Sequence, residues 1–133
     1  MRVIGPGRFS LRRAIPILGG TVSGEISGTI LPGGSDWQQA SADGLAELDA
    51  RYMFETPEGA LVEVRNYGFR HSSPEVVKRI AAGEEVPPGD YYMRTAARLE
   101  TGHPAHAWIN RVMFVGTGAK VGARVQIDLY AVG

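Results

Sequence analysis

Cysteine is absent from the 133-residue sequence. Its absence excludes disulfide bonds, a thiolate nucleophile and every zinc site that uses cysteine ligands. It also fits a reducing compartment, so we expect a cytoplasmic protein. Long apolar runs are missing too: none approaches membrane-spanning length, and Met1–Gly7 lacks the apolar stretch typical of a signal peptide. We therefore expect no membrane partner.

Charge of one sign is not in excess either, because Lys+Arg 14 balances Asp+Glu 14. Without a global positive field, we expect no nucleic acid partner. A Gly-x-Ser-x-Gly elbow, which carries the nucleophilic serine of a hydrolase triad, is also absent.

We expect a small-molecule ligand and no cofactor.

The histidines do not predict a metal site. His103 and His106 are three residues apart, beside Pro104. In a β context, residues with this spacing point to opposite faces, so we expect no metal. The glycine-rich run Gly116–Gly122 looks superficially like a phosphate loop. Because a strand-like run follows it and not a helix, it predicts a hairpin connection.

Alternation of apolar and polar residues dominates the rest of the chain, and most of the 18 glycines fall between the alternating runs. This pattern is typical of strands joined by turns and bulges. The predicted strands are Phe9–Ile17, Val22–Ile30, Leu45–Phe54, Ala60–His71, Tyr91–Glu100, Ala107–Val115 and Val121–Val132. Leu31–Asp36 and Thr56–Gly59 are predicted turns. One helix is predicted over Pro74–Ala82, with Ser73 as its N-cap.

These elements predict one all-β domain over residues 1–133. A sandwich and a barrel both fit the number of strands. Closure into a barrel removes exposed strand edges, and glycines inside strands supply the bulges that closure needs. We therefore predict a single antiparallel β-barrel with one short α-helix.

In the predicted strand Ala60–His71, the positions that should face inward include polar residues. Val62 and Val64 fix its inward face, and the same parity carries Asn66 and Arg70 inward. A buried asparagine or arginine is costly unless it is paired or serves a ligand. Two interpretations are open: a binding site, or a structural hydrogen-bond network or bulge.

A second concentration of polar and aromatic residues lies in Asp90–Glu100, and in Trp108 and Asn110 after it. Both faces of these predicted strands mix the two kinds of residue. Such strands fit a wall between core and cavity, but they fit a subunit interface equally well.

A series of short blocks resembles the domain-of-unknown-function 3237 family, also called UPF0311. The blocks are Gly19–Thr21, Pro32–Trp37, Asp49–Tyr52, Val64–Asn66, Pro74–Val76, Tyr91–Arg94, Leu99–Gly102 and Trp108–Arg111. The resemblance implies a small β-barrel without an assigned activity, and it adds Trp37 and Glu100 to the candidate site.

The chain departs from this family pattern at its start. Only Met1–Leu11 precede Arg12, where the family has a further strand-forming stretch. Either that strand is short or the barrel has a gap. A gap would expose a strand edge and favour pairing between subunits, so we expect a homodimer or higher homo-oligomer.

Two functions are open. The first is a cofactor-free isomerase, lyase or cyclase acting inside the barrel on an apolar carboxylate or carbonyl compound. Its predicted catalytic residues are Asp36, Glu100 and Tyr92, and its predicted binding residues are Trp37, Tyr52, Asn66, Arg70, Arg94, Trp108 and Asn110. The second is a non-catalytic carrier of a small apolar acid. A purely structural oligomer is a third. We expect Asn66, Arg70 and Arg94 to converge with Tyr52, Trp37 and Glu100 on one cavity.

Overall fold

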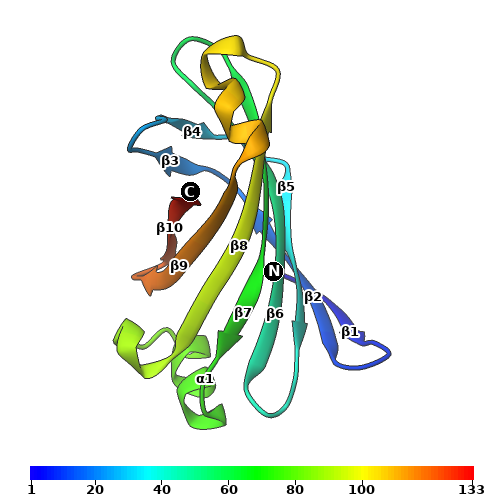
Figure 1. Cartoon of the computed structure of the whole chain (residues 1–133). Helices are drawn as coiled ribbons and strands as arrows, with labels where there is room; N and C mark the ends of the chain where they lie inside the picture. Colours follow the sequence, from blue (N-terminus) through cyan, green and yellow to red (C-terminus); the bar gives the residue numbers. More distant parts are fainter.

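The protein is built from one antiparallel sheet of ten strands, as shown by a computed structural model that describes residues 1–133. Eight of these strands form the continuous path β1-β2-β5-β6-β7-β8-β9-β10, and the β3–β4 hairpin attaches to β6. The strands are β1 (Arg2–Pro6), β2 (Leu11–Ile17), β3 (Gly20–Val22), β4 (Gly28–Ile30), β5 (Gly34–Ala40), β6 (Leu45–Glu55), β7 (Leu61–His71), β8 (Tyr92–Thr101), β9 (Met113–Val121) and β10 (Arg124–Val132). The sheet curls along this path (Figure 1), and the predicted β-barrel class is confirmed.

The curled sheet is open along one edge. β1 pairs with β2 and β10 pairs with β9, but no ladder joins β1 to β10. β1 is short, and its register shifts between Val3 and Gly5. The first strand is therefore short, and no ladder closes the sheet between β1 and β10.

The one α-helix, α1 (Pro74–Ala81), begins where the sequence predicts. The Ser73 side chain accepts a hydrogen bond from the Val76 backbone N–H at 3.2 Å, and Pro74 occupies the first turn. Ile80 is the buried residue of the helix. Two 3-10 segments, η1 (Pro88–Asp90) and η2 (Pro104–Arg111), complete the structure. No helix has the length and apolar character needed to cross a membrane.

The interior contains two separate apolar clusters. The first consists of Phe54, Val62, Val64, Ala97, Leu99, Ile109 and Phe114. The second consists of Ala46, Leu48, Ile80, Val86, Tyr91 and Met93. Small domains usually have one contiguous core, so the residues between the two clusters become the main question about this fold.

Two element predictions at the start of the chain are wrong. Val22–Ile30 is not one strand but the β3–β4 hairpin, which turns at Gly24 with a φ of 118°. Leu31–Asp36 is a turn only at its start, because β5 begins at Gly34. The inward residues Asp36 and Gln38 of β5 are polar, so the strand lacks the alternation that predicts one.

After β8, the predicted strand Ala107–Val115 is wrong, and the predicted hairpin connection Gly116–Gly122 is correct only at its end. Ala107–Val115 is largely the 3-10 segment η2, which starts at Pro104, where His103 Nδ1 accepts from the Ala105 N–H at 3.2 Å. Gly116 and Gly118 lie inside β9 and not in its turn. A Cβ at Gly116 would lie 2.4 Å from the Thr95 hydroxyl, so the neighbouring side chain requires glycine there. The hairpin turn falls at Gly122, whose φ is 60°.

Candidate functional site

The parity predicted for β7 is confirmed. Val62, Val64 and Asn66 are buried, whereas the alternate residues of the strand face outward. Asn66 lies between Ala50 of β6 and Ala97 of β8, and Ala50 in turn lies opposite Asp36 of β5. One row across the inner face therefore carries both Asp36 and Asn66.

A band of polar side chains crosses this inner face. On β8, Thr95 stands between Ala97 of the first apolar cluster and Met93 of the second. We call the band the polar belt. Its members are Arg13, Asp36, Gln38, Asn66, Arg70 and Thr95. The polar belt separates the two apolar clusters, which explains why the core is divided.

A chain of hydrogen bonds fixes one side of the polar belt. Arg13 Nε donates to Gln38 Oε1 at 2.8 Å, and Gln38 Nε2 donates to Asp36 Oδ2 at 2.7 Å. The Asp49 backbone N–H donates to Asp36 Oδ1 at 3.0 Å. Gln38 is buried, so its amide holds the Asp36 carboxylate in one orientation.

Burial shifts the pKa values of two residues of the polar belt, Asp36 and Arg70. It raises the pKa of Asp36, against the hydrogen bonds from Gln38 and the Asp49 backbone. It lowers the pKa of Arg70, and the nearby charge of Arg13 lowers that pKa further, while Asp36 opposes the change. No ion pair within 4.0 Å includes Arg70. The polar belt thus holds two guanidinium groups and one carboxylate, which favours an anionic ligand.

Two polar atoms of the belt have no partner. Asn66 is 4% exposed and Thr95 is 7% exposed, and neither Asn66 Oδ1 nor Thr95 Oγ1 makes a hydrogen bond. Buried polar atoms are nearly always paired, because leaving one unpaired costs about 1–3 kcal/mol. Both atoms lie on the inner face of the sheet, and the chain supplies neither with a hydrogen-bond partner.

Tyr52 also lies on the inner face, one row from the polar belt, where it faces Val64 across β6 and β7. Its side chain is half-buried and packs against the first apolar cluster. Burial raises the pKa of its phenol, so the group stays protonated and able to donate a hydrogen bond. The structure therefore places Asp36, Tyr52, Asn66 and Arg70 on the same inner face of the sheet.

Four other predicted site residues lie on the opposite face. Trp37 follows Asp36 on β5, so it points outward and is 48% exposed. Tyr92, Arg94 and Glu100 occupy the outward positions of β8, which alternate with the buried ones. The predicted convergence of Trp37, Arg94 and Glu100 on the interior is wrong, since period-2 geometry sends them away from it.

Arg94 is held on the outer face by its own neighbours. Its guanidinium lies 5.4 Å from the centre of the Tyr92 ring and donates to the Met93 carbonyl at 2.9 Å. These residues border an open surface hollow of about 370 Å³, lined by His71, Pro88, Gly89, Asp90, Tyr91, Tyr92 and Arg94. The hollow is on the outer side of the sheet, away from Asn66.

Trp108 and Asn110 serve the fold and lie outside the polar belt. Both are in η2, and the Trp108 ring packs 6.0 Å from the Phe114 ring. Asn110 Oδ1 accepts from the Thr101 N–H at 2.9 Å, and Asn110 Nδ2 donates to the Thr101 carbonyl at 2.9 Å. Asn110 therefore fastens η2 to the end of β8, and its predicted place in the ligand site is wrong.

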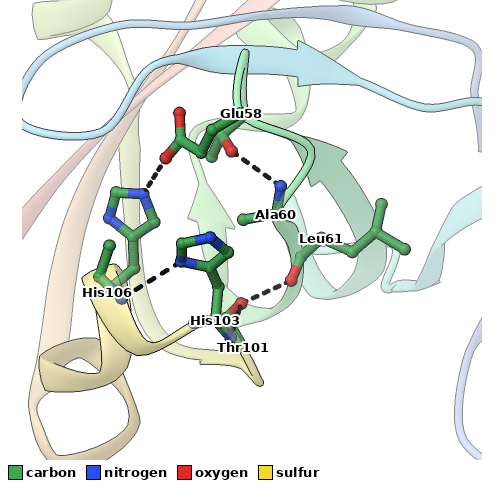
Figure 2. Close-up of polar contacts among 8 residues, drawn as sticks. Glu58, Ala60, Leu61, Thr101, His103 and His106 are labelled. Atoms are coloured by element: carbon green, nitrogen blue, oxygen red, sulfur yellow. Dashed lines mark hydrogen bonds and ion pairs between the residues drawn. The ribbon is translucent and has the colours of Figure 1, made fainter.

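A second polar cluster lies beside η2 (Figure 2). His106 Nε2 is 2.5 Å from Glu58 Oε1, and Thr101 Oγ1 donates to the Leu61 carbonyl at 2.7 Å. The hydrogen bond to His106 holds the pKa of Glu58 below its usual range. The His106–Glu58 contact joins η2 to the β6–β7 turn, and the Thr101–Leu61 hydrogen bond joins β8 to β7. The structure has no group of three or more His, Cys, Asp or Glu side chains arranged for a metal ion.

Sequence reasoning missed Arg13, Gln38 and Thr95. Thr95 could have been found from Met93, since the two share a parity on β8. Arg13 and Gln38 could not, because their inward direction depends on the pairing of β2 with β5 across the β3–β4 hairpin. That register is a tertiary fact that no local pattern contains.

Asp36→Asn tests the burial of the carboxylate. Because the folded pKa of Asp36 is raised above its ordinary value of 3.8, the folded state binds this proton more tightly than the unfolded state. The free energy of unfolding should therefore fall as pH rises from about 4 through the folded pKa. The free energy of unfolding of the wild type minus that of Asp36→Asn, measured by urea unfolding, should fall across the same pH range. The exposed-site variant Asp90→Asn is the control. A difference that rises with pH would show that the carboxylate is stabilised by its surroundings.

Comparisons with known proteins agree with this fold. A family model described as "Protein of unknown function (DUF3237)" matches residues 2–132. The UPF0311 protein RPA1785 of Rhodopseudomonas palustris is 47% identical over 123 residues, covering 92% of this chain and 80% of that protein. The UPF0311 protein blr7842 of Bradyrhizobium diazoefficiens is 41% identical over 124 residues, covering 93% and 82%.

Solved structures also resemble the chain. The crystal structure of RPA1785 has a TM-score of 0.87 and covers 91% of this chain and 82% of that one. A β-barrel-like protein from Acinetobacter baumannii, 39% identical, has a TM-score of 0.82 and covers 97% and 83%. An enzyme from Penicillium herquei, 20% identical with a TM-score of 0.64 and coverage of 90% and 73%, shares the fold alone.

Proposed function

This chain belongs to the DUF3237 family of proteins of unknown function, also called UPF0311, and we propose that it binds a small organic acid at the polar belt and acts on it by cofactor-free acid–base chemistry. One observation carries the proposal. Asn66 and Thr95 are buried with unpaired oxygens, on the same inner face as a guanidinium that lacks an ion-pair partner.

Binding follows from charge and shape. Arg70 meets a carboxylate or an enolate oxygen, for which its planar fork of donors is suited. The apolar clusters on either side receive the hydrocarbon part of the ligand. Entry is from the solvent that reaches the half-buried Asp36, Tyr52 and Arg70. The gap between β1 and β10 keeps that side of the sheet open.

Asp36 supplies the base. The raised pKa of Asp36 is closer to neutral pH than that of an ordinary aspartate. A carboxylate with such a pKa both accepts and returns a proton effectively. The carboxylate takes a proton from the carbon next to a carbonyl group. That C–H bond breaks, its electron pair forms the enolate double bond, and the carbonyl pair moves onto oxygen, where Arg70 stabilises the charge. Return of the proton to another carbon gives an isomer, and loss of a neighbouring leaving group gives an elimination product.

A carrier is the second candidate, and a specific contact favours it. Both oxygens of Asp36 already accept hydrogen bonds, from Gln38 and from the Asp49 backbone. A carboxylate held in this way can position Arg13 through Gln38 without touching the ligand. The acid would then be bound at Arg70 and released unchanged.

Arg70→Met tests the binding site. We expect it to weaken the affinity for benzoate about tenfold in a calorimetric titration, since one charge-assisted contact is lost. The folded state should keep its stability or gain some, because a buried charge without a partner is removed. Arg65→Met, on the outward face of the same strand, is the matched control and should bind as the wild type does. A loss of about 2–5 kcal/mol in the free energy of unfolding of Arg70→Met would instead assign Arg70 a structural role.

Exchange of a carbon-bound proton separates enzyme from carrier. Phenylpyruvate in heavy water exchanges the hydrogens next to its carbonyl group slowly without a catalyst. An enzyme of the proposed kind accelerates this exchange, and Asp36→Asn removes the acceleration while Arg65→Met keeps it. Phenylpyruvate that binds to the protein without faster exchange identifies a carrier.

A further inference from the structure

Three arginines stand side by side on the outer face of the sheet, and we call them the arginine row. Arg51 of β6 lies directly across from Arg65 of β7, which in turn lies directly across from Arg98 of β8. Like charges that face each other across neighbouring strands destabilise a sheet. Only Arg65 has an ion-pair partner within 4.0 Å, which is Glu63 of its own strand at 3.2 Å. Arg51 and Arg98 are exposed and have no carboxylate partner in the chain.

A row of opposite charge lies next to the arginine row, two residues along the same strands. Glu63 of β7 lies directly across from Glu100 of β8, and we call these two residues the glutamate row. Glu100 is exposed and makes no ion pair within 4.0 Å, not even with Arg98 of its own strand. Both rows therefore repel themselves across the strands, and on β8 both charges lack a partner.

Neither helical segment covers the two rows. The buried residues of α1 and η2, Ile80 and Ile109, belong to the inner apolar clusters, so both segments pack against the inner side of the sheet. On the outer side of β7, apolar residues flank the two rows. Leu61 is 49% exposed and Tyr67 is 43% exposed. Exposed apolar side chains beside unpaired charges are typical of an interaction surface.

The order of these residues along β7 and β8 is self-complementary. Consider two copies packed outer face to outer face, related by a two-fold axis that runs between them, parallel to the rows and midway between the arginine and glutamate rows. Arg98 of each copy then meets Glu100 of the other, which is the reciprocal contact that a two-fold interface requires. The same rotation places Leu61 of each copy on Tyr67 of the other, so an apolar contact borders the charged ones.

We propose that the chain forms a two-fold dimer through the outer face of β6, β7 and β8, with the arginine row of each copy on the glutamate row of the other. A polyanion is the other class of partner for an arginine row, but the glutamates beside it would repel a polyanion. The polar belt lies on the opposite face, so this dimer is independent of the proposed function.

Exchange of the two charges on β8 tests the dimer by sedimentation equilibrium of the whole chain. We expect the wild type to dimerise at micromolar concentration, and more weakly as sodium chloride is added, because salt screens exposed charges. Arg98→Glu and Glu100→Arg each bring like charges together, so each should weaken dimerisation at least about tenfold. Both positions are exposed, so both variants should fold as the wild type does.

A mixture of the two variants distinguishes the proposed contact from a general effect of charge. Arg98→Glu carries two carboxylates on β8 and Glu100→Arg carries two guanidinium groups, so together they should form a heterodimer although neither dimerises well alone. The double variant Arg98→Glu/Glu100→Arg should dimerise as the wild type does. The matched control is Arg94→Glu, which makes the same change on the outer face of β8 but outside the two rows, and it should leave the dimer intact.

Four results would overturn the proposal. A wild type that stays monomeric at micromolar concentration excludes the dimer, and single variants that dimerise as the wild type does exclude this face. Single variants that dissociate but do not associate with each other show that the arginine and glutamate rows do not meet. A monomer that binds heparin through Arg98, and loses that binding in Arg98→Glu, would assign the arginine row to a polyanion.

Discussion

Asn66→Leu is expected to raise the free energy of unfolding by about 2 kcal/mol. Asn66 is 4% exposed and its Oδ1 has no partner, so the folded state bears the cost of burying an unsatisfied amide. Leucine has nearly the same volume and joins Val64 and Ala97, which are already in contact in the first apolar cluster. The gain is therefore the removed desolvation cost together with new apolar contacts.

Urea unfolding of the two proteins at one pH gives the measurement. A higher midpoint with an unchanged slope identifies a gain in stability. This direction is unusual, because most substitutions at buried positions destabilise. If Asn66→Leu lowers the free energy of unfolding by 1 kcal/mol or more, as for a paired amide, then Asn66 is part of a structural network and the polar belt is not a ligand site.

Asn110→Leu should do the opposite and lower the free energy of unfolding by about 3 kcal/mol. Its amide makes two hydrogen bonds of 2.9 Å to the backbone of Thr101, one to the N–H and one to the carbonyl. Thr101 is buried, so both backbone groups lose a partner that water cannot easily replace. The loss should also loosen η2, which Asn110 fastens to the end of β8.

Asn110→Asp is the matched control for this variant. The carboxylate still accepts from the Thr101 N–H but no longer donates to the carbonyl, so about half of the loss should remain. Ligand affinity should be unchanged in both variants, since Asn110 lies outside the polar belt. An Asn110→Leu protein as stable as the wild type would show that the two hydrogen bonds contribute nothing.

These two asparagines show how far the sequence could predict the site. The alternation of β7 is unambiguous, because Val62 and Val64 identify the buried parity, and it placed Asn66 and Arg70 correctly. Nothing comparable identifies the role of Asn110. Its contact with Thr101 depends on the 3-10 path of η2, which local propensity did not distinguish from a strand.

β8 and β5 show why the remainder of the site could not be predicted. Arginine and tyrosine stand at outward positions of β8, while the inward ones include Thr95, so polarity alone does not identify the buried face. On β5 the inward residues Asp36 and Gln38 are polar and hydrogen-bonded to each other. The alternation of apolar and polar residues that identifies a strand is therefore missing there. Local rules fail most readily where residues serve a ligand and not the core.

The family resemblance supplied the fold and not the site. It suggested Trp37 and Glu100, and both lie on the outer face. Trp37 shares that face with other exposed apolar side chains, among them Tyr67, Val115 and Tyr130. They agree with the predicted homo-oligomer, which stays a prediction. Light scattering at micromolar concentration would test it, and a monomer would contradict it.

The most direct test of the account is to locate a bound acid by nuclear magnetic resonance. Saturating benzoate added to isotope-labelled protein should shift the side-chain amide of Asn66 and the backbone amide of Thr95, and Arg70→Met should suppress both shifts. The outer-face residues Tyr92 and Glu100 should not respond. Shifts confined to the outer hollow beside His71 and Arg94, with Asn66 unaffected, would contradict the claim that the polar belt is the ligand site.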